Sequence, residues 1–147
     1  MATKDMFSKN RMCFDLKATN KGEVIKELIE ILYEDEKITD KEKFRQAVLK
    51  REEEFSTGIG MGIAIPHGKS DTVKEASITF GRSNKGIDYE SMDDKPAYLY
   101  FLISVPEESS DIHLRALSEI SRKLMHTEIR EKLFKAESFE EFIKVFE

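Results

Sequence analysis

The sequence has 147 residues, of which 36% are charged, and its formal net charge of −5 argues against a nucleic-acid partner, because phosphate backbones attract basic surfaces. The length suits one domain with its own core, so we expect a single domain over residues 1–147, with residues 1–6 loosely ordered. The sequence has no apolar run of about 20 residues and no secretion signal, which predicts a cytoplasmic protein without membrane insertion.

Two helices are predicted in the first third of the chain. Asn20 followed by Glu23 forms a capping box, which predicts a helix over residues 21–35. Asp40 is a cap for a second helix that ends near Glu54, and apolar side chains recur at helical spacing in both. The acidic run at the end of the second helix is predicted to be a solvated face.

Three strand-like runs follow, over residues 59–65, 76–81 and 97–105. The last run is continuously apolar, which is typical of a central strand. In the first run large side chains alternate with glycine or alanine, so one face is apolar and the other is nearly bare. Pro66 stops that run because proline donates no hydrogen bond to a sheet, and this places His67 at a strand end.

The pattern beyond Pro106 is helical to the end of the chain. Ser110 is the predicted cap of a helix whose first turn would hold His113, and a shorter helical turn follows it. Ser138 and Glu141 form a capping box for the last helix. Strands and helices in this order predict an α/β fold in which helices cover both faces of one sheet.

The segment around His67 carries the most specific motif. The motif begins at Glu52 and continues, after six further residues, with Ile59-Gly60. After two more residues it ends with Ile63-Ala64-Ile65-Pro66-His67-Gly68. It resembles the signature of the fructose- and mannitol-type (type 2) enzyme IIA domains of the bacterial phosphoenolpyruvate-dependent sugar phosphotransferase system. Weaker agreement continues through Gly86-Ile87-Asp88-Tyr89 and His113-Leu114. The resemblance implies a three-layer α/β/α sandwich with a mixed central sheet.

The resemblance also implies roles for three side chains. In that family the histidine of the Pro-His-Gly element accepts a phosphoryl group, which carries over to His67. A second histidine and an upstream arginine help to hold the group, and the matching positions are His113 and Arg51. Each residue has a plainer interpretation: a turn residue for His67, a surface pair with Glu54 for Arg51, and an ordinary helix-start residue for His113.

The implied function is a phosphotransferase component that relays a phosphoryl group during sugar uptake, of the fructose type. The implied donor is the histidine-containing phosphocarrier protein, and the implied acceptor is a cysteine of an enzyme IIB partner. Two alternatives use the same fold: a regulatory enzyme IIA-like protein that acts by phosphorylation-dependent binding, and a noncatalytic interaction domain.

Imidazole chemistry fits a relay, because a pKa of about 6.5 leaves a free histidine largely neutral and nucleophilic at pH 7. We expect one ring nitrogen of His67 to attack while the other donates a hydrogen bond to a backbone carbonyl or a hydroxyl oxygen. Lys69 is a further possible source of positive charge near the phosphoryl group.

Metal and nucleotide cofactors are not expected. The histidines lack the close spacing of zinc ligands. The Gly68-Lys69-Ser70 segment matches the end of a phosphate-binding loop, but the leading glycine of that motif would fall at Ile63. For protein partners, we expect acidic groups near the site, and Met61, Ile87, Tyr89 and Met92 are candidates either for an exposed rim or for the core.

Overall fold

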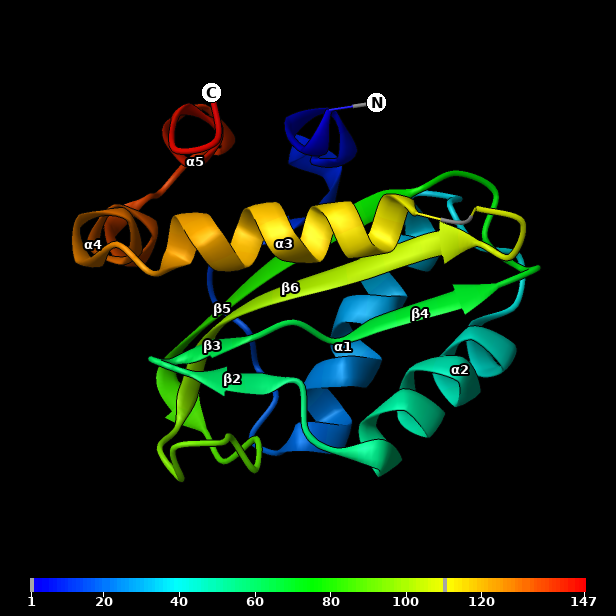
Figure 1. The fold of residues 1–147 in the computed structure, drawn as a ribbon, viewed down its shortest axis with the longest axis horizontal. Helices are drawn as coiled ribbons and strands as arrows, with labels where there is room; N and C mark the ends of the chain where they lie inside the picture. Colours follow the sequence, from blue (N-terminus) through cyan, green and yellow to red (C-terminus); the bar gives the residue numbers. More distant parts are fainter. Residues whose placement is uncertain (1, 110) are drawn as a thin grey trace.

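The computed structural model describes residues 2–109 and 111–147 and shows helices on both faces of a mixed sheet (Figure 1). Within this part of the chain the sheet has six strands: β1 (Met12–Cys13), β2 (Gly58–Gly60), β3 (Ile63–Ala64), β4 (His67–Ser70), β5 (Ser77–Ile87) and β6 (Ala97–Pro106). The strand order is β1-β5-β6-β3-β2, and β4 pairs with β6 beyond β3. The predicted α/β sandwich is therefore confirmed.

The helices flank this sheet in two groups. They are the 3-10 helices η1 (Thr3–Met6) and η2 (Lys9–Arg11), and the α-helices α1 (Lys21–Glu34), α2 (Lys41–Glu54), α3 (Ile112–Leu124), α4 (Thr127–Lys135) and α5 (Phe139–Lys144). Helices α1 and α2 pack on one face of the sheet, and α3 lies across the other face together with α4 and α5 (Figure 1). None of the helices in the described segments is long and apolar enough to span a membrane.

Strand β6 is the central strand, as its continuous apolar run predicted. It pairs antiparallel with β5 and parallel with both β3 and β4, and every residue from Leu99 to Val105 is buried. Its side chains alternate between two cores. Phe101 and Ile103 pack with the α3 to α5 layer, whereas Tyr100 and Leu102 pack with α1 and α2.

The predicted helix caps are confirmed where the structure describes them. Asn20 accepts a hydrogen bond from the Glu23 backbone N–H at 2.9 Å, and Asp40 caps α2 in the same way. Ser138 accepts from the Glu141 N–H at 3.2 Å. The predicted cap Ser110 lies outside the described residues. These side chains bond to amides only three residues away, which is why the sequence alone reveals them.

The prediction of one strand over residues 59–65 is wrong. The chain reverses within this run, and β2 pairs antiparallel with β3. The reversal is possible because Gly60, Met61 and Gly62 all have positive φ angles, of 96°, 59° and 79°. The apolar alternation continues through the turn and so concealed it.

His67 lies at a strand end, but it opens the next strand instead of closing the previous one. Strands β3 and β4 pair in turn with the same edge of β6, and they are interrupted at Ile65 and Pro66. The Pro66 carbonyl still accepts a hydrogen bond from the Ile103 N–H at 3.0 Å, so the chain keeps its alignment with β6 across the interruption.

Residues 1–6 were expected to be loosely ordered; Met1 lies outside the described residues, and the structure places Thr3–Met6 in the helix η1. Met6 is only 2% exposed and joins the core beneath α3 and α5. Burial of this large apolar side chain holds the segment against the sheet, at a gain of about 1.5–3 kcal/mol for such a residue.

Candidate functional site

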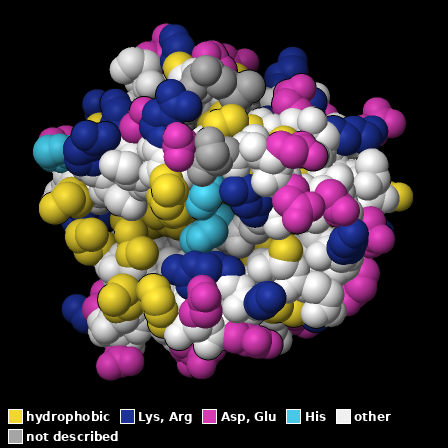
Figure 2. Space-filling model, turned by 45° about the vertical axis from the view of Figure 1, so that its right-hand side comes forward, with side chains coloured by type: hydrophobic (Ala, Val, Ile, Leu, Met, Phe, Trp, Pro, Cys, Tyr) yellow, Lys and Arg dark blue, Asp and Glu magenta, His cyan; other side chains and the backbone are white. Residues whose placement is uncertain are grey.

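A groove of about 550 Å³ opens between α2, β4 and α3. Arg51 reaches it from the last turn of α2, His67 from the first position of β4, and His113 from the first turn of α3. Figure 2 shows histidine side chains together at the centre of this face, with cationic and hydrophobic side chains beside them. The structure thus brings together the three site residues predicted from the sequence.

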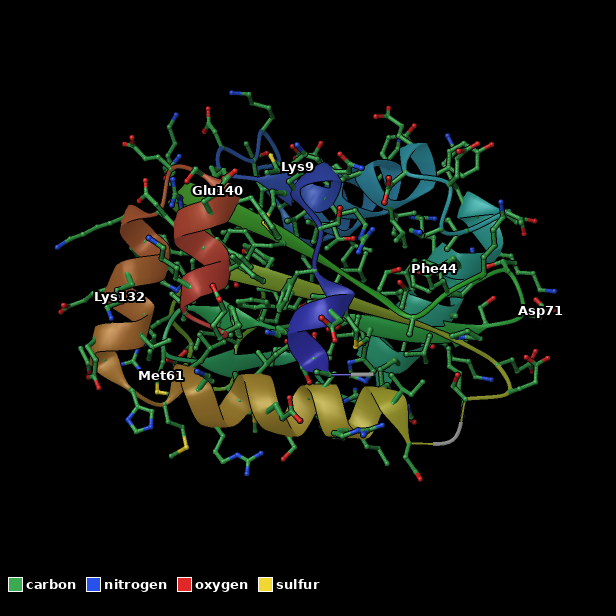
Figure 3. The ribbon with its side chains drawn as sticks, turned by 90° about the horizontal axis from the view of Figure 1, so that it is seen from above. Lys9, Phe44, Met61, Asp71, Lys132 and Glu140 are labelled. Carbon is green, nitrogen blue, oxygen red and sulfur yellow. The ribbon has the colours of Figure 1, made fainter. Side chains whose placement is uncertain are left out.

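Gly68 allows α2 to approach the strand that carries His67. A Cβ atom at this position would lie 3.0 Å from Val48 and 3.1 Å from Phe44, closer than a side chain normally tolerates. Phe44 projects from α2 toward the sheet at the end of the molecule that also holds Asp71 (Figure 3). A glycine after the histidine therefore serves the packing of α2, which in turn presents Arg51 to the groove.

The His67 ring is held by its own chain. Its Nδ1 atom lies 2.9 Å from the Ile65 carbonyl oxygen. A carbonyl only accepts hydrogen bonds, so Nδ1 carries the proton and Nε2 keeps its lone pair. Burial lowers the pKa of His67 below its ordinary value, and the nearby charge of Arg51 lowers it further. The ring is consequently neutral at pH 7.

The His113 ring faces the His67 ring at a centroid distance of 6.4 Å, and the two planes are inclined by 26°. Its Nδ1 atom is buried and has no hydrogen-bond partner among the described residues. A proton on that nitrogen would be a buried unsatisfied donor, which favours the tautomer with the proton on Nε2. Burial, together with the charge of Lys69, lowers the pKa of His113.

Arg51 is held at the end of α2. Its Nη1 donates to the Phe55 carbonyl at 3.0 Å, and its guanidinium carbon lies 4.5 Å from the centre of the Phe55 ring. Its Nε is 3.9 Å from a carboxylate oxygen of Glu54, so the surface pair considered from the sequence is present at long range. The Phe55 contacts orient the guanidinium, which still lines the groove.

The groove itself is lined mainly by basic side chains, whereas the sequence predicted acidic groups near the site. Lys50, Arg51 and Lys69 line the groove, against the single carboxylate of Glu54. Lys69 follows His67 by two residues in β4 and therefore lies on the same side of the strand. The direction of the Lys69 side chain was not predictable from the sequence, because no strand starting at His67 was expected there.

The four candidates for a partner-binding rim separate into two pairs. Ile87 and Tyr89 are 2% and 0% exposed and belong to the core. Met61 and Met92 are 45% and 72% exposed. Glu52, predicted to be solvated, is also buried, at 8% exposure. Within the described part of the chain, no three histidine, cysteine or acidic side chains gather as metal ligands.

Comparison with known proteins connects this geometry to a family. Residues 5–147 match the sequence model of a family described as "Phosphoenolpyruvate-dependent sugar phosphotransferase system, EIIA 2". The chain is 41% identical over 145 residues to the fructose-specific EIIABC component of Bacillus subtilis (strain 168), which covers 99% of this chain but only 23% of that longer protein. It is 46% identical over 121 residues to the fructose-specific EIIA component of Haloferax volcanii, covering 82% of this chain and 78% of that protein.

Solved structures agree with the sequence comparison. The crystal structure of the nitrogen regulatory protein IIA-Ntr from Neisseria meningitidis superimposes with a TM-score of 0.91 at 30% identity, covering 98% of each chain. Enzyme IIAMTL from Escherichia coli, determined in complex with phosphorylated enzyme IIBMTL, gives a TM-score of 0.81 at 23% identity and covers 95% of this chain and 96% of that one. At that identity, the second likeness shows the fold alone.

Proposed function

We propose that His67 accepts a phosphoryl group and passes it on, because this chain belongs to the type 2 enzyme IIA family of the phosphoenolpyruvate-dependent sugar phosphotransferase system. Members of this family are phosphotransfer components. The proposed donor is the phosphorylated histidine-containing phosphocarrier protein, and the proposed acceptor is a cysteine of an enzyme IIB partner in uptake of a fructose-type sugar. The observation that carries this proposal is the Nδ1 hydrogen bond of His67 to Ile65, which leaves Nε2 free as a nucleophile.

In the proposed reaction the Nε2 lone pair of His67 attacks phosphorus in line with the bond to the donor histidine nitrogen. That bond breaks, its electron pair returns to the donor ring, and a new nitrogen–phosphorus bond forms. The His67 ring gains positive charge as it bonds to phosphorus. The Ile65 carbonyl, already bonded to Nδ1–H, stabilises this charge because hydrogen bonds to a charged group are stronger.

Arg51 and His113 are proposed to hold the oxygens of the transferred group. The planar fork of an arginine matches two phosphoryl oxygens, and the Nε2–H of His113 supplies a further donor. Such donors act before the reaction begins, so they stabilise the transition state without reorganisation. In the second half-reaction a thiolate of the partner attacks phosphorus, and the electron pair of the nitrogen–phosphorus bond returns to His67.

Radioactive labelling tests the assignment of His67. Wild-type protein and His67→Ala would be incubated with labelled phosphoenolpyruvate, enzyme I and the phosphocarrier protein. We expect about one phosphoryl group on the wild type, which is stable in alkali and lost in acid, and none on the variant. Peptide mass spectrometry in alkaline solution should place the added mass on the peptide containing His67. Label on His67→Ala would disprove the proposal.

A regulatory role is the second candidate function, and a specific observation favours it. The structure with a TM-score of 0.91 is named a nitrogen regulatory protein. In that case phosphorylation of His67 would control binding to a partner instead of feeding sugar uptake. Rapid loss of label to a fructose-type enzyme IIB domain indicates transport, whereas a stable phosphoprotein with phosphorylation-dependent binding indicates regulation. A chain that is never phosphorylated would be a noncatalytic interaction domain.

A further inference from the structure

We propose that the buried carboxylate of Glu52 is the positioning group that holds His67 and Arg51 in one fixed arrangement. The proposal rests on the proposed function of His67 and assigns to Glu52 a role in that reaction. Glu52 does not line the groove and so does not touch the phosphoryl group. It acts through the backbone that carries the two groove residues.

Four donors meet at the Glu52 carboxylate. One oxygen accepts from the Thr57 backbone N–H at 3.1 Å and lies 3.0 Å from the Lys21 ammonium nitrogen. The other oxygen accepts from the Thr57 hydroxyl and, at 3.2 Å, from the Tyr89 hydroxyl. The Glu52 side chain is only 4% exposed, so these contacts replace water almost completely. A buried charge with this many partners restrains every segment that supplies one.

A continuous path of hydrogen bonds leads from Glu52 to the His67 ring. The carboxylate holds the Thr57 N–H, and the Thr57 carbonyl accepts from the Ile65 N–H at 3.0 Å. The Ile65 carbonyl then accepts from His67 Nδ1 at 2.9 Å. Displacement of Thr57 would therefore move the carbonyl that determines which ring nitrogen of His67 carries the proton.

Arg51 is tied to the same carboxylate by the helix. Arg51 immediately precedes Glu52 in α2, and successive side chains of an α-helix point about 100° apart. Because Glu52 is fixed in the core, the Arg51 side chain is directed away from the core, where it lines the groove. Helix α2 ends at Glu54, and within its last turn Arg51 also donates to the Phe55 carbonyl just beyond the helix. Glu52 thus stabilises the turn that presents the guanidinium.

Tyr89 and Lys21 complete the network. Burial, with the Glu52 carboxylate beside it, raises the pKa of Tyr89 well above its ordinary value, so its hydroxyl remains a hydrogen-bond donor. The Lys21 nitrogen lies 4.8 Å from the centre of the Tyr89 ring and also 3.4 Å from Glu90. Lys21 is the first residue of α1, and it balances the charge of Glu52. Donors from three segments, at Lys21, Thr57 and Tyr89, consequently meet at the carboxylate that α2 carries.

The test compares Glu52→Gln with a matched control, Asp35→Asn. Both replace a carboxylate in an ion pair by an amide; the Glu52 side chain is 4% exposed, and the Asp35 side chain is 17% exposed in its pair with Arg11. Lys21, which contacts Glu52, is the first residue of α1, and Asp35 directly follows the last residue of that helix. The 14 residues of α1, about 21 Å long, therefore separate the control position from the Glu52 network. We expect Glu52→Gln to lower the rate of His67 phosphorylation by about 10- to 100-fold, because an error of about 1 Å in position has such an effect. Asp35→Asn should leave the rate unchanged.

A second measurement does not depend on phosphorylation. The ¹⁵N chemical shifts of the His67 ring report which nitrogen carries the proton in the unmodified protein. Wild type and Asp35→Asn should show the Nδ1–H tautomer, whereas Glu52→Gln should show a mixture. If wild-type protein is never labelled but the ring shifts still respond to Glu52→Gln, the phosphoryl transfer proposal fails and the positioning role stands.

Two outcomes would overturn the positioning role. One is a Glu52→Gln protein that loses thermal stability but keeps the wild-type phosphorylation rate and the wild-type His67 tautomer. The other is an unaffected Tyr89→Phe protein. This variant removes one hydroxyl donor and keeps the ring, so it tests the proposal even if Glu52→Gln does not fold. We expect Tyr89→Phe to lower the phosphorylation rate about 3- to 10-fold, consistent with the loss of about 1 kcal/mol for one hydrogen bond. An unchanged rate and tautomer in this variant would also contradict the proposal.

Discussion

Two hollows lie toward opposite ends of the sheet and differ in their chemistry. The groove beside His67 has about 550 Å³, and a hollow of about 380 Å³ lies beside the β2–β3 turn, lined by residues that include Met61, Tyr98 and Phe134. Figure 3 shows Met61 and Lys132 at one end of the molecule and Phe44 at the other.

The difference lies in which polar atoms are already bonded. In the second hollow, the Asp93 carboxylate accepts from the Met61 N–H at 3.0 Å and the Lys95 N–H at 3.1 Å, so it serves the turn. The Tyr98 and Phe134 rings pack edge to face at 5.7 Å. In the groove, by contrast, the His67 ring bonds within the described chain through Nδ1, which leaves Nε2 without a partner there, and Arg51, Lys69 and His113 line the same groove. Convergence of free polar atoms is what makes the groove a candidate site.

The largest effect short of removing His67 should come from Arg51 in the groove. We expect Arg51→Gln to lower the phosphorylation rate by about 10²- to 10³-fold, the usual loss for one preorganised donor to a developing charge. Arg51→Lys keeps the charge but loses the fork, and it should recover only part of the rate. Stopped-flow or quench measurement of label transfer gives both numbers. Full activity of Arg51→Gln would contradict the proposed role.

His113 should contribute less, because it supplies one donor. His113→Ala is expected to lower the phosphorylation rate about 10- to 100-fold, since one hydrogen bond to a charged group contributes about 1.5–3 kcal/mol. His113→Gln retains an N–H donor and should recover part of the loss. If glutamine and alanine behave alike in the same transfer assay, a hydrogen-bonding role for this position is wrong.

The pH dependence sharpens the comparison, because of these two hollows the groove is the one lined by histidines, His67 and His113. The folded pKa of both His67 and His113 lies below the ordinary value of 6.5, so between the two values the unfolded chain binds more protons. The free energy of unfolding should therefore fall as the pH drops below 6.5, and His67→Gln should flatten this slope. Urea unfolding at a series of pH values measures how the free energy of unfolding depends on pH. An unchanged slope in His67→Gln would show that burial does not lower the pKa of His67.

The smallest effect on phosphorylation should come from the second hollow. Gly62 has a φ of +79°, so Gly62→Ala should cost about 1–2 kcal/mol in the free energy of unfolding, without a change in transfer rate. The melting temperature should fall by roughly 2–4 °C for each kcal/mol. Gly22→Ala is the control, because Gly22 lies inside α1 with ordinary space around it and alanine favours helix there. A slower transfer in Gly62→Ala would show that the turn communicates with the groove.

Much of the fold was predictable because its signals are local. Capping side chains such as Asn20 and Asp40 bond to amides three residues away, and the apolar run of β6 reflects burial on both faces. The turn between β2 and β3 was missed because Met61 continues the apolar alternation although its backbone is left-handed. The side-chain pattern there is that of one continuous strand, but the chain reverses, and only the antiparallel pairing of β2 with β3 reveals the turn.

The residue types at the candidate site were also available from the sequence, through the resemblance of the Pro-His-Gly motif, but their arrangement was not. Arg51, His67 and His113 come from separate elements, and only packing of α2 and α3 around β4 brings them to one groove. The basic lining arose in the same way, because Lys69 shares a side of the strand with His67.

The sequence by itself determined where α1, α2 and α5 begin, which strand is central and which histidine is the candidate acceptor, since each of these depends on neighbours in the chain. The tertiary structure alone decided that Nε2 of His67 is the free nitrogen and that Glu52 is buried. Both depend on hydrogen bonds that form only in the folded chain. The orientation of the His67 ring depends on the break between β3 and β4. Burial of the Glu52 carboxylate depends on donors from Lys21 and Tyr89. A charged side chain leaves water only where such partners converge, and a linear pattern does not record that convergence.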